Sequence, residues 1–431
     1  MESRGRSRKK NTKKSTGRLI ADLSVILLLS GLVFLLAKEL VKTEPAPPET
    51  ETPEITAAAG TREENSRQEI TAAVLSERKT EPETETESET EPPKYAEAPD
   101  TKLLDSRYED HRTVTLTFAG DILFDPHYAV MASLLSRTGG ALEIRQMFDE
   151  NILAAMRSSD IFVVNNEFPY SDRGEPLEDK QFTFRASPAS ASLLTEMGAD
   201  IAVLANNHMY DHGEAALLDT LDTLSGIGLF HIGAGRDLSE ASAPVYFTNG
   251  RIKIGFLAAT QIERMASPDT KGATETSPGV FRCMNSSLLL EKIGEMKEDC
   301  DFIVVYLHWG TESSEQVDVH QKKLAKEVAD AGADLIIGDH PHVLQGIDRV
   351  NGVPVIYSLG NFLFNSRTQD TCLFTAELDQ DTAELLSLRF LPARQEGCRT
   401  RLLVGDEQLE VIEAMRALSG VPIDNEGWIG D

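Results

Sequence analysis

The stretch that decides the fold reads Leu335-Ile336-Ile337-Gly338-Asp339-His340-Pro341-His342-Val343. Its apolar, β-branched start predicts a buried strand, and Gly338 and Pro341 end that strand abruptly. His340 and His342 then fall on the loop at the carboxyl end of the strand, where open α/β sheets place their functional residues. Two imidazoles one residue apart can face one metal ion, although an isolated His-Pro-His sequence is more simply explained by a turn and by packing.

Other apolar runs of the chain also end in polar side chains of the kind that bind metals. The runs and the residues that follow them are Thr113–Ala119 with Asp121, Asp160–Val164 with Glu167, Asp200–Ala205 with Asn207 and His208, Asp301–Leu307 with His308, and Pro354–Leu359 with Asn361. Helical patterns at 144–157, 188–198, 214–225, 288–297 and 319–331 separate most of these runs. The alternation predicts an α/β fold whose sheet is largely parallel and covered by helices.

Later segments add antiparallel elements to this pattern. Val245–Thr260 is predicted to be a hairpin with Asn249-Gly250 as a two-residue turn. Segments 372–378, 386–391 and 401–404 are predicted strands, and 407–418 is a predicted terminal helix.

The residues at the strand ends are predicted to form one metal site. Carboxylates, an amide oxygen and imidazoles are suitable ligands for one or two divalent ions of manganese, iron or zinc. Each residue also has an ordinary explanation, such as a helix cap for Asp121 or an ion pair between Glu167 and Arg185. A single shared site accounts for all of them at once. The expected ligands are Asp121, Glu167, Asn207, His308, His340 and His342.

The N-terminal part predicts a membrane anchor. Residues 1–18 are strongly basic, and residues 19–37 are almost wholly apolar, close to the ~20 residues that a helix needs to cross a bilayer. A cleaved signal peptide is the alternative, but no small-x-small cleavage site follows. A basic flank stays in the cytoplasm, so we expect a single-pass protein of the cell membrane whose C-terminal domain is extracellular.

Residues 43–105 are predicted to be a disordered acidic linker. They consist mainly of Glu, Thr, Pro and Ala, and cannot bury enough apolar surface to fold. Much of the formal net charge of −28 comes from this segment, and it argues against nucleic acid as a partner. The four cysteines form no C-x-x-C pair, so the sequence leaves them either free or paired in disulfides.

Six motifs follow one another between Thr113 and Phe364, namely Gly120-Asp121, Asn166-Glu167, Ala205-Asn206-Asn207-His208, His308-Trp309-Gly310, Gly338-Asp339-His340-Pro341-His342 and Tyr357-Ser358-Leu359-Gly360-Asn361-Phe362. This ordered set resembles the CapA family of capsule and poly-γ-glutamate biosynthesis proteins. That family is itself similar to the calcineurin-like metallophosphoesterases. The resemblance implies an αββα sandwich at residues 111–395, followed by a C-terminal strand and helix extension at 396–431.

The resemblance also implies roles for these residues. Glu167 would bridge two metals, and His208 would be the catalytic acid that protonates a leaving oxygen. Arg185 and Asn361 are expected to bind substrate, Arg185 because a guanidinium offers two parallel donors.

The sequence departs from the phosphoesterase pattern in two places. Leu123 stands where those enzymes have a metal-binding histidine, and a glutamate replaces the bridging aspartate. Asp125 or His127 could replace the missing ligand only by bending back. The sequence therefore leaves open a site with one metal instead of two, and an inherited site that only binds an anionic polymer.

The resulting expectation is a membrane-anchored extracytoplasmic protein for the synthesis, export or attachment of poly-γ-glutamate or a related anionic polymer. Its partners would be that polymer and a membrane synthase or export complex. An extracellular metal-dependent hydrolase of phosphoester or polymer bonds is the second hypothesis, and a non-catalytic scaffold stabilised by metal is the third.

Overall fold

The computed structural model describes residues 94–104, 112–262 and 271–430. The predicted basic tail, membrane helix and most of the linker lie outside these ranges. Among the residues that are described, no helix combines the length and the apolar character needed to cross a membrane.

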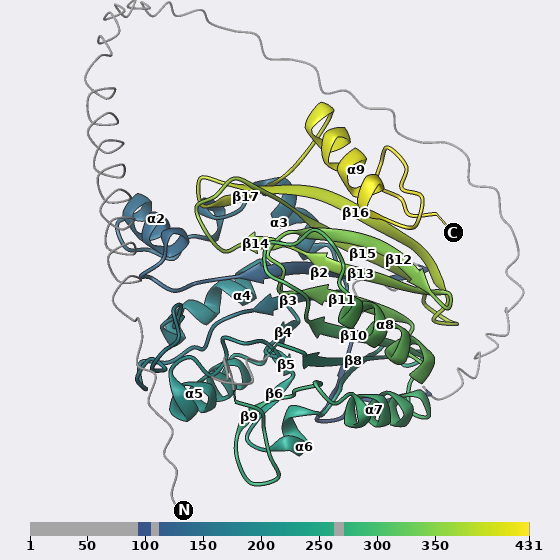
Figure 1. The fold of residues 1–431 in the computed structure, drawn as a ribbon, viewed down its shortest axis with the longest axis horizontal. Helices are drawn as coiled ribbons and strands as arrows, with labels where there is room; N and C mark the ends of the chain where they lie inside the picture. Colours follow the sequence, from purple (N-terminus) through teal and green to yellow (C-terminus); the bar gives the residue numbers. More distant parts are fainter. Residues whose placement is uncertain (1–93, 105–111, 263–270, 431) are drawn as a thin grey trace, which may run out of the picture. The chain divides into compact units, whose positions relative to one another are not determined.

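Two β-sheets form the centre of the described region (Figure 1). In spatial order, the first sheet contains β1 (Thr101–Leu103), β7 (Val245–Thr248), β8 (Lys253–Thr260), β10 (Phe302–His308), β11 (Leu335–Asp339), β13 (Val353–Leu359) and β12 (Leu344–Val350). The second sheet contains β17 (Arg399–Leu402), β16 (Leu385–Glu396), β15 (Gln369–Asp379), β2 (Thr113–Ile122), β3 (Ile161–Asn166), β4 (Ile201–Val203) and β5 (Phe230–Ile232), with β14 (Asn361–Leu363) paired to β2. Each sheet contains four adjacent strands that run parallel. These are β8, β10, β11 and β13 in the first sheet and β2, β3, β4 and β5 in the second.

Apolar side chains fill the space between the sheets and also coat their outer faces. Alternation along β2 points Leu116 and Phe118 into the central core, where they meet Phe256 and Val304 of the first sheet. Helices α2 (Ala129–Thr138), α3 (Glu150–Arg157), α4 (Ser192–Met197) and α5 (Gly213–Gly226) cover the second sheet, and α7 (Ser287–Lys297) and α8 (Val319–Ala331) cover the first. The predicted αββα sandwich is therefore confirmed.

The C-terminal segment belongs to the same core. Helix α9 (Asp406–Leu418) packs on β12 and β16, and it buries Val411, Ile412 and Met415 among the residues between the sheets. Strand β17 extends the second sheet.

Four details differ from the sequence-based expectations. Thr101–Leu103, inside the predicted disordered linker, forms β1 because it pairs in parallel with β7. The predicted hairpin is β7 and β8, but its loop contains four residues, since Thr248 pairs with Lys253 and the Asn249 side chain accepts from the backbone N–H groups of Arg251 and Ile252. The predicted helix at 144–157 is divided into a 3₁₀ turn at Ile144–Gln146 and α3, which Asp149 caps. The predicted helix at 188–198 likewise begins as a 3₁₀ turn at Pro188–Ala191, which α4 follows.

The short elements α6 (Leu238–Ala241), β6 (Ala234–Gly235) and β9 (Gly279–Val280) complete the described fold.

All four cysteines are free thiols in the described region. Burial raises the pKa of Cys283 to about 12 and that of Cys300 to about 12, so both stay protonated at neutral pH. Of the two possibilities left by the sequence, the structure supports unpaired cysteines.

Candidate metal centre

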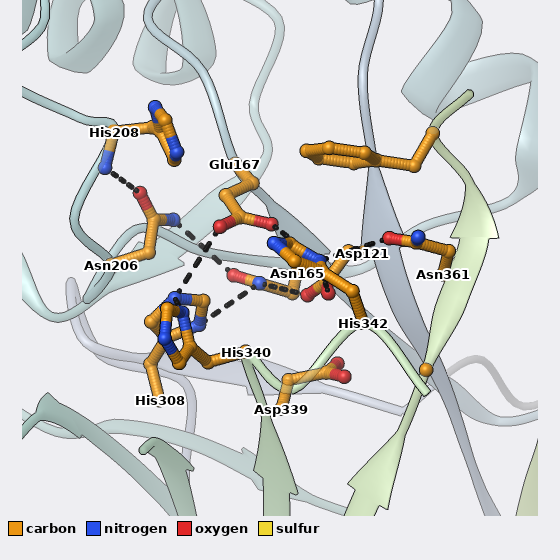
Figure 2. Close-up of polar contacts among 12 residues, drawn as sticks. Asp121, Asn165, Glu167, Asn206, His208, His308, Asp339, His340, His342 and Asn361 are labelled. Atoms are coloured by element: carbon orange, nitrogen blue, oxygen red, sulfur yellow. Dashed lines mark hydrogen bonds and ion pairs between the residues drawn. The ribbon is translucent and has the colours of Figure 1, made fainter. Parts of the chain in front are cut away.

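The polar residues at the strand ends converge between the two sheets (Figure 2). Strands β2, β3 and β4 contribute from the second sheet, β10 and β11 from the first, and β14 from its pairing with β2. Parallel strands that end at the same edge deliver residues distant in sequence to one place. The predicted residues that meet there are Asp121, Glu167, Asn207, His208, His308, His340, His342 and Asn361.

A β-bulge aims Asp121 at this site. The register of β2 against β3 shifts between Ala119 and Asp121. The extra residue interrupts the regular alternation of side chains, so the carboxylate of Asp121 points toward His342 at the edge between the two sheets. Gly120 makes the close approach of β14 possible, because a Cβ on it would lie 1.9 Å from the carbonyl oxygen of Gly360. Asp121 is fully buried, and its Oδ1 accepts a 2.6 Å hydrogen bond from Asn165 Nδ2.

Glu167 lies at the centre of the cluster with no hydrogen-bond donor. It is completely buried, yet neither carboxylate oxygen accepts a hydrogen bond from any residue in the described ranges. Burial, followed by the charges of Asp121 and Asp339, raises its pKa well above the ordinary value. Its Oε1 lies 3.4 Å from His308 Nε2, and its Oε2 lies 4.0 Å from His342 Nδ1. A buried carboxylate without a donor is costly, and a cation between these atoms would remove that cost.

One side of Glu167, which we call the histidine side, consists of Asn207, His308 and His340. His308 Nε2 lies 2.8 Å from Asn207 Oδ1 and 3.1 Å from His340 Nδ1. Burial, with the neighbouring histidines, lowers the pKa of both imidazoles well below the ordinary value. They are therefore neutral near pH 7, the state in which a histidine binds a metal.

The other side, which we call the carboxylate side, consists of Asp121, His342 and Asn361. His342 Nδ1 lies 2.8 Å from Asp121 Oδ2 and 3.0 Å from Asn361 Oδ1. Burial disfavours the charged form of His342, but the hydrogen bond to Asp121 and its charge outweigh this effect and raise the pKa. In the absence of a cation, the ring of His342 is held as an ion-pair partner of Asp121.

The backbone of the loop is strained at both of its histidines. His340 has φ of 100° and His342 has φ of 60°, in the region that residues with a Cβ rarely occupy. Such strain costs about 1–3 kcal/mol per residue and persists only where the surrounding structure imposes it. Here it turns both rings toward Glu167, as Figure 2 shows.

His208 is held next to the cluster by residues that the sequence analysis did not identify. Its Nδ1 donates a 2.7 Å hydrogen bond to Asp211 Oδ2, and its ring packs on that of Phe184 with centroids 4.2 Å apart. Lys180 Nζ lies 2.6 Å from Asp211 Oδ1 and 2.5 Å from the backbone oxygen of Asn207. Burial, with the charges of Lys180 and His342, lowers the pKa of His208 well below its ordinary value. The ring is therefore neutral and presents an unprotonated Nε2.

The residues considered as replacements for the missing histidine lie elsewhere. The side chain of His127 is 83% exposed, and Leu123, at the position of the missing histidine itself, packs in the core under the helices that cover the second sheet. Asp125 accepts from the backbone N–H groups of His127 and Arg185, so it supports a loop.

Arg185 does not contact the cluster. Its guanidinium donates to the backbone oxygens of Arg173 and Gly174. The ion pair with Glu167 that the sequence allowed is not formed, and a role of Arg185 in substrate binding stays a prediction.

The cluster fits a divalent metal. Ligand atoms of Glu167, His340 and His342 all lie within 4.8 Å of one another. Around an octahedral ion with metal–ligand bonds of about 2.1 Å, adjacent ligand atoms lie about 3.0 Å apart. The contacts of His308 Nε2 and of His342 Nδ1 with their neighbours, at 2.8–3.1 Å, are close to this separation. The donor set of neutral imidazoles, carboxylates and amide oxygens suits a divalent transition metal and does not distinguish manganese, iron and zinc.

Residues 115–366 match the family model described as bacterial capsule synthesis protein PGA_cap. The chain belongs to this capsule synthesis family. It is 31% identical over 290 residues to "Capsule biosynthesis protein CapA" of Bacillus anthracis, covering 65% of this chain and 67% of that protein. It is 31% identical over 292 residues to "PGA biosynthesis protein CapA" of Bacillus subtilis strain 168, covering 66% and 72%. A "Probable polyglutamine synthesis accessory protein" of Mycobacterium tuberculosis is 27% identical over 261 residues, covering 56% and 68%.

Solved structures similar to this capsule synthesis protein include a phosphatase from Mycoplasma pneumoniae. It has a TM-score of 0.41 and 15% identity, covering 66% of this chain and 94% of that one.

Three residues of the site were missed from the sequence. The spacing Asn206-Asn207-His208-Met209-Tyr210-Asp211 could have indicated Asp211, since it places a carboxylate three residues after a histidine in one loop. Asn165 lies two residues before Glu167 and could have been inferred from the alternation of β3. No local pattern marks Lys180, because its partner Asp211 is 31 residues later in the sequence and only the fold brings the two together.

Proposed function

We propose that this chain is a membrane-anchored, extracytoplasmic component of capsule polymer production whose domain uses a divalent metal centre. Membership of the capsule synthesis family supports the capsule role, and the names of the Bacillus and Mycobacterium relatives support poly-γ-glutamate or a related polymer. The basic and apolar N-terminal segments support the anchor. The polymer would be assembled or exported by membrane proteins with which this chain associates.

The observation that carries the metal centre is Glu167, a buried carboxylate that lies between imidazoles and whose two oxygens accept no hydrogen bond from any residue that the structure describes. Glu167 would bridge the two sides, with Asn207, His308 and His340 on one and Asp121 and His342 on the other. A metal bound there would supply Lewis acidity toward a phosphoryl or carbonyl oxygen and would lower the pKa of bound water. The protein itself would contribute buried side chains in a fixed arrangement.

His208 can move a proton at the edge of this centre. Because Asp211 accepts from Nδ1, the unprotonated nitrogen is Nε2, and contact with Phe184 keeps the ring in place. Because its pKa is lowered, the neutral ring is a weak base, and it must take up a proton before it can protonate a leaving oxygen. This arrangement favours metal-dependent hydrolysis of a phosphoester or polymer bond as the second candidate function.

Deletion of the gene in its native host tests the capsule role. We expect surface polymer to be lost, restored by the wild-type gene, and not restored by Glu167→Gln at equal protein levels. Normal polymer in the deletion strain would refute the role. Fractionation and protease digestion of intact cells test the location, because an extracellular domain should be degraded while its membrane anchor stays in the pellet.

Hydrolysis is tested with the full-length chain loaded with manganese or zinc and assayed on a chromogenic phosphodiester and on poly-γ-glutamate. His208→Ala should lower the rate by about 10²–10⁴-fold with unchanged metal content. Equal rates in both proteins would refute catalysis by this site and favour the metal-stabilised scaffold.

A further inference from the structure

The carboxylate side has an excess of acceptors around one ring nitrogen. His342 Nδ1 has two oxygen neighbours, Asp121 Oδ2 at 2.8 Å and Asn361 Oδ1 at 3.0 Å. A single N–H can point well at only one of them. Two oxygens and a nitrogen at these separations also match adjacent ligand atoms around one metal ion.

The orientation of the Asn361 amide is fixed by its neighbours. The backbone oxygen of His342 can only accept, so Gln369 turns its Nε2 toward it, at 3.3 Å. Gln369 therefore turns Oε1 toward Asn361 Nδ2, at 3.2 Å. The remaining atom of the amide, Oδ1, then faces His342.

A second anchor fixes the orientation of Gln369 independently. The backbone N–H of Arg367 can only donate, and it donates to Asn365 Oδ1 at 2.8 Å. Asn365 thus presents its Nδ2 to Gln369 Oε1, at 2.9 Å. Two backbone groups of opposite character therefore lead to one assignment, in which a carbonyl oxygen of Asn361 points at the cluster.

We infer that Asn361 Oδ1 is a metal ligand and completes a second metal position together with Asp121, His342 and Glu167. Asn361 is 2% exposed and sits on β14, which the pairing with β2 holds beside Asp121. The inference rests on the proposed metal centre and adds to it both a ligand and the number of ions. Leu123, which stands where the phosphoesterases have a metal-binding histidine, packs into the core outside the cluster. The oxygen of Asn361 would supply the ligand that Leu123 cannot.

A purely positioning role for Asn361 makes an opposite prediction for one variant. In Asn361→Asp the carboxylate cannot donate to Gln369, so a positioning residue would lose its contact and metal binding would weaken. A ligand would keep an oxygen at the metal and gain charge, so binding would be retained or tightened.

The test is metal binding by the full-length chain and four proteins: wild type, Asn361→Ala, Asn361→Asp and the control Asn365→Ala. Asn365 is a matched control because it also donates to Gln369 Oε1, while its own carbonyl oxygen accepts from Arg367 and Gln395. Manganese is titrated by calorimetry and counted by elemental analysis, and magnetic coupling between two manganese ions is read by electron paramagnetic resonance. Circular dichroism verifies that each variant is folded.

We expect two ions in wild type, Asn365→Ala and Asn361→Asp, with a coupled spectrum. Asn361→Ala should keep one ion and bind the second at least ~10-fold more weakly, with an uncoupled spectrum. One ion in the wild type, or weakened binding in Asn361→Asp, would overturn the inference and leave the metal centre standing. No bound ion in the wild type would overturn the metal centre and the inference together.

Discussion

The two sides of Glu167 hold their histidines in opposite electrostatic states. On the histidine side, burial and neighbouring histidines lower the pKa of His308 and that of His340, whereas the hydrogen bond to Asp121 and its charge raise the pKa of His342 on the carboxylate side. The first pair is ready to bind a cation, while His342 must first give up a proton and its ion pair. In the proposed centre, Glu167 would join one position that favours metal at near-neutral pH with one whose affinity depends on pH.

Removing the residue shared by both sides should have the largest effect. Glu167→Ala should weaken metal binding by at least about 100-fold on each side, because it takes one oxygen from each position. Elemental analysis after dialysis should find almost no metal. If one ion is retained, Glu167 does not bridge the two sides.

A change at Lys180 should affect mainly the histidine side. Lys180→Met leaves Asp211 buried without its cation and should lower the free energy of unfolding by about 3–5 kcal/mol. It also removes the donor to the backbone oxygen of Asn207, so metal should be lost from the histidine side first. Chemical denaturation and calorimetry measure the two effects.

The control for this variant is Lys271→Met, which removes a partly exposed lysine paired with Glu214. It should change the free energy of unfolding by less than about 1 kcal/mol. Equal losses in the two variants would contradict a structural role for the buried pair.

Acidification should separate the two sides. A proton competes with metal for His342 below its raised pKa, so affinity on the carboxylate side should fall by about 10-fold per pH unit there. His308 and His340 have lowered pKa values and meet little competition over the same range. Manganese titrations between pH 8 and pH 6 should thus lose the weaker site first, and simultaneous loss of both would contradict the comparison.

The smallest effect is expected at His127, a replacement ligand considered from the sequence. Its side chain is 83% exposed, so His127→Ala should change the free energy of unfolding by less than about 0.5 kcal/mol and leave the number of bound ions unchanged. Loss of an ion in this variant would show that the loop bends back to the metal.

The sequence predicted the long elements of the fold because their patterns are local. Strands β2, β10, β11 and β13 are continuous or alternating runs of apolar residues, and α8 was predicted with the bounds observed. Strands β1, β6 and β14 contain two or three residues and are held by partners far along the chain, so no local pattern marks them. The two-sheet arrangement came from the family resemblance rather than from periodicity.

The residues of the candidate site also divide into those marked by a local pattern and those placed by distant partners. Residues at the ends of long strands, such as His308, could be predicted because the topology carries them to one edge. The orientation of Asn361 depends on a chain of amide contacts through Gln369, and the place of Lys180 depends on a loop that folds back. Both depend on tertiary contacts that spacing in the sequence does not encode.

The left-handed backbone at His340 and His342 sets stability against function in this loop. Glycine would adopt these angles without strain, so His342→Gly would lose a ligand and yet relieve a local cost. At position 342 this relief competes with the loss of the buried ion pair to Asp121, so selection for thermal stability alone favours glycine there only where the relieved strain is larger than that loss. Variants of this chain that melt at higher temperature should therefore be ranked by metal content before they are used as improved forms of the protein.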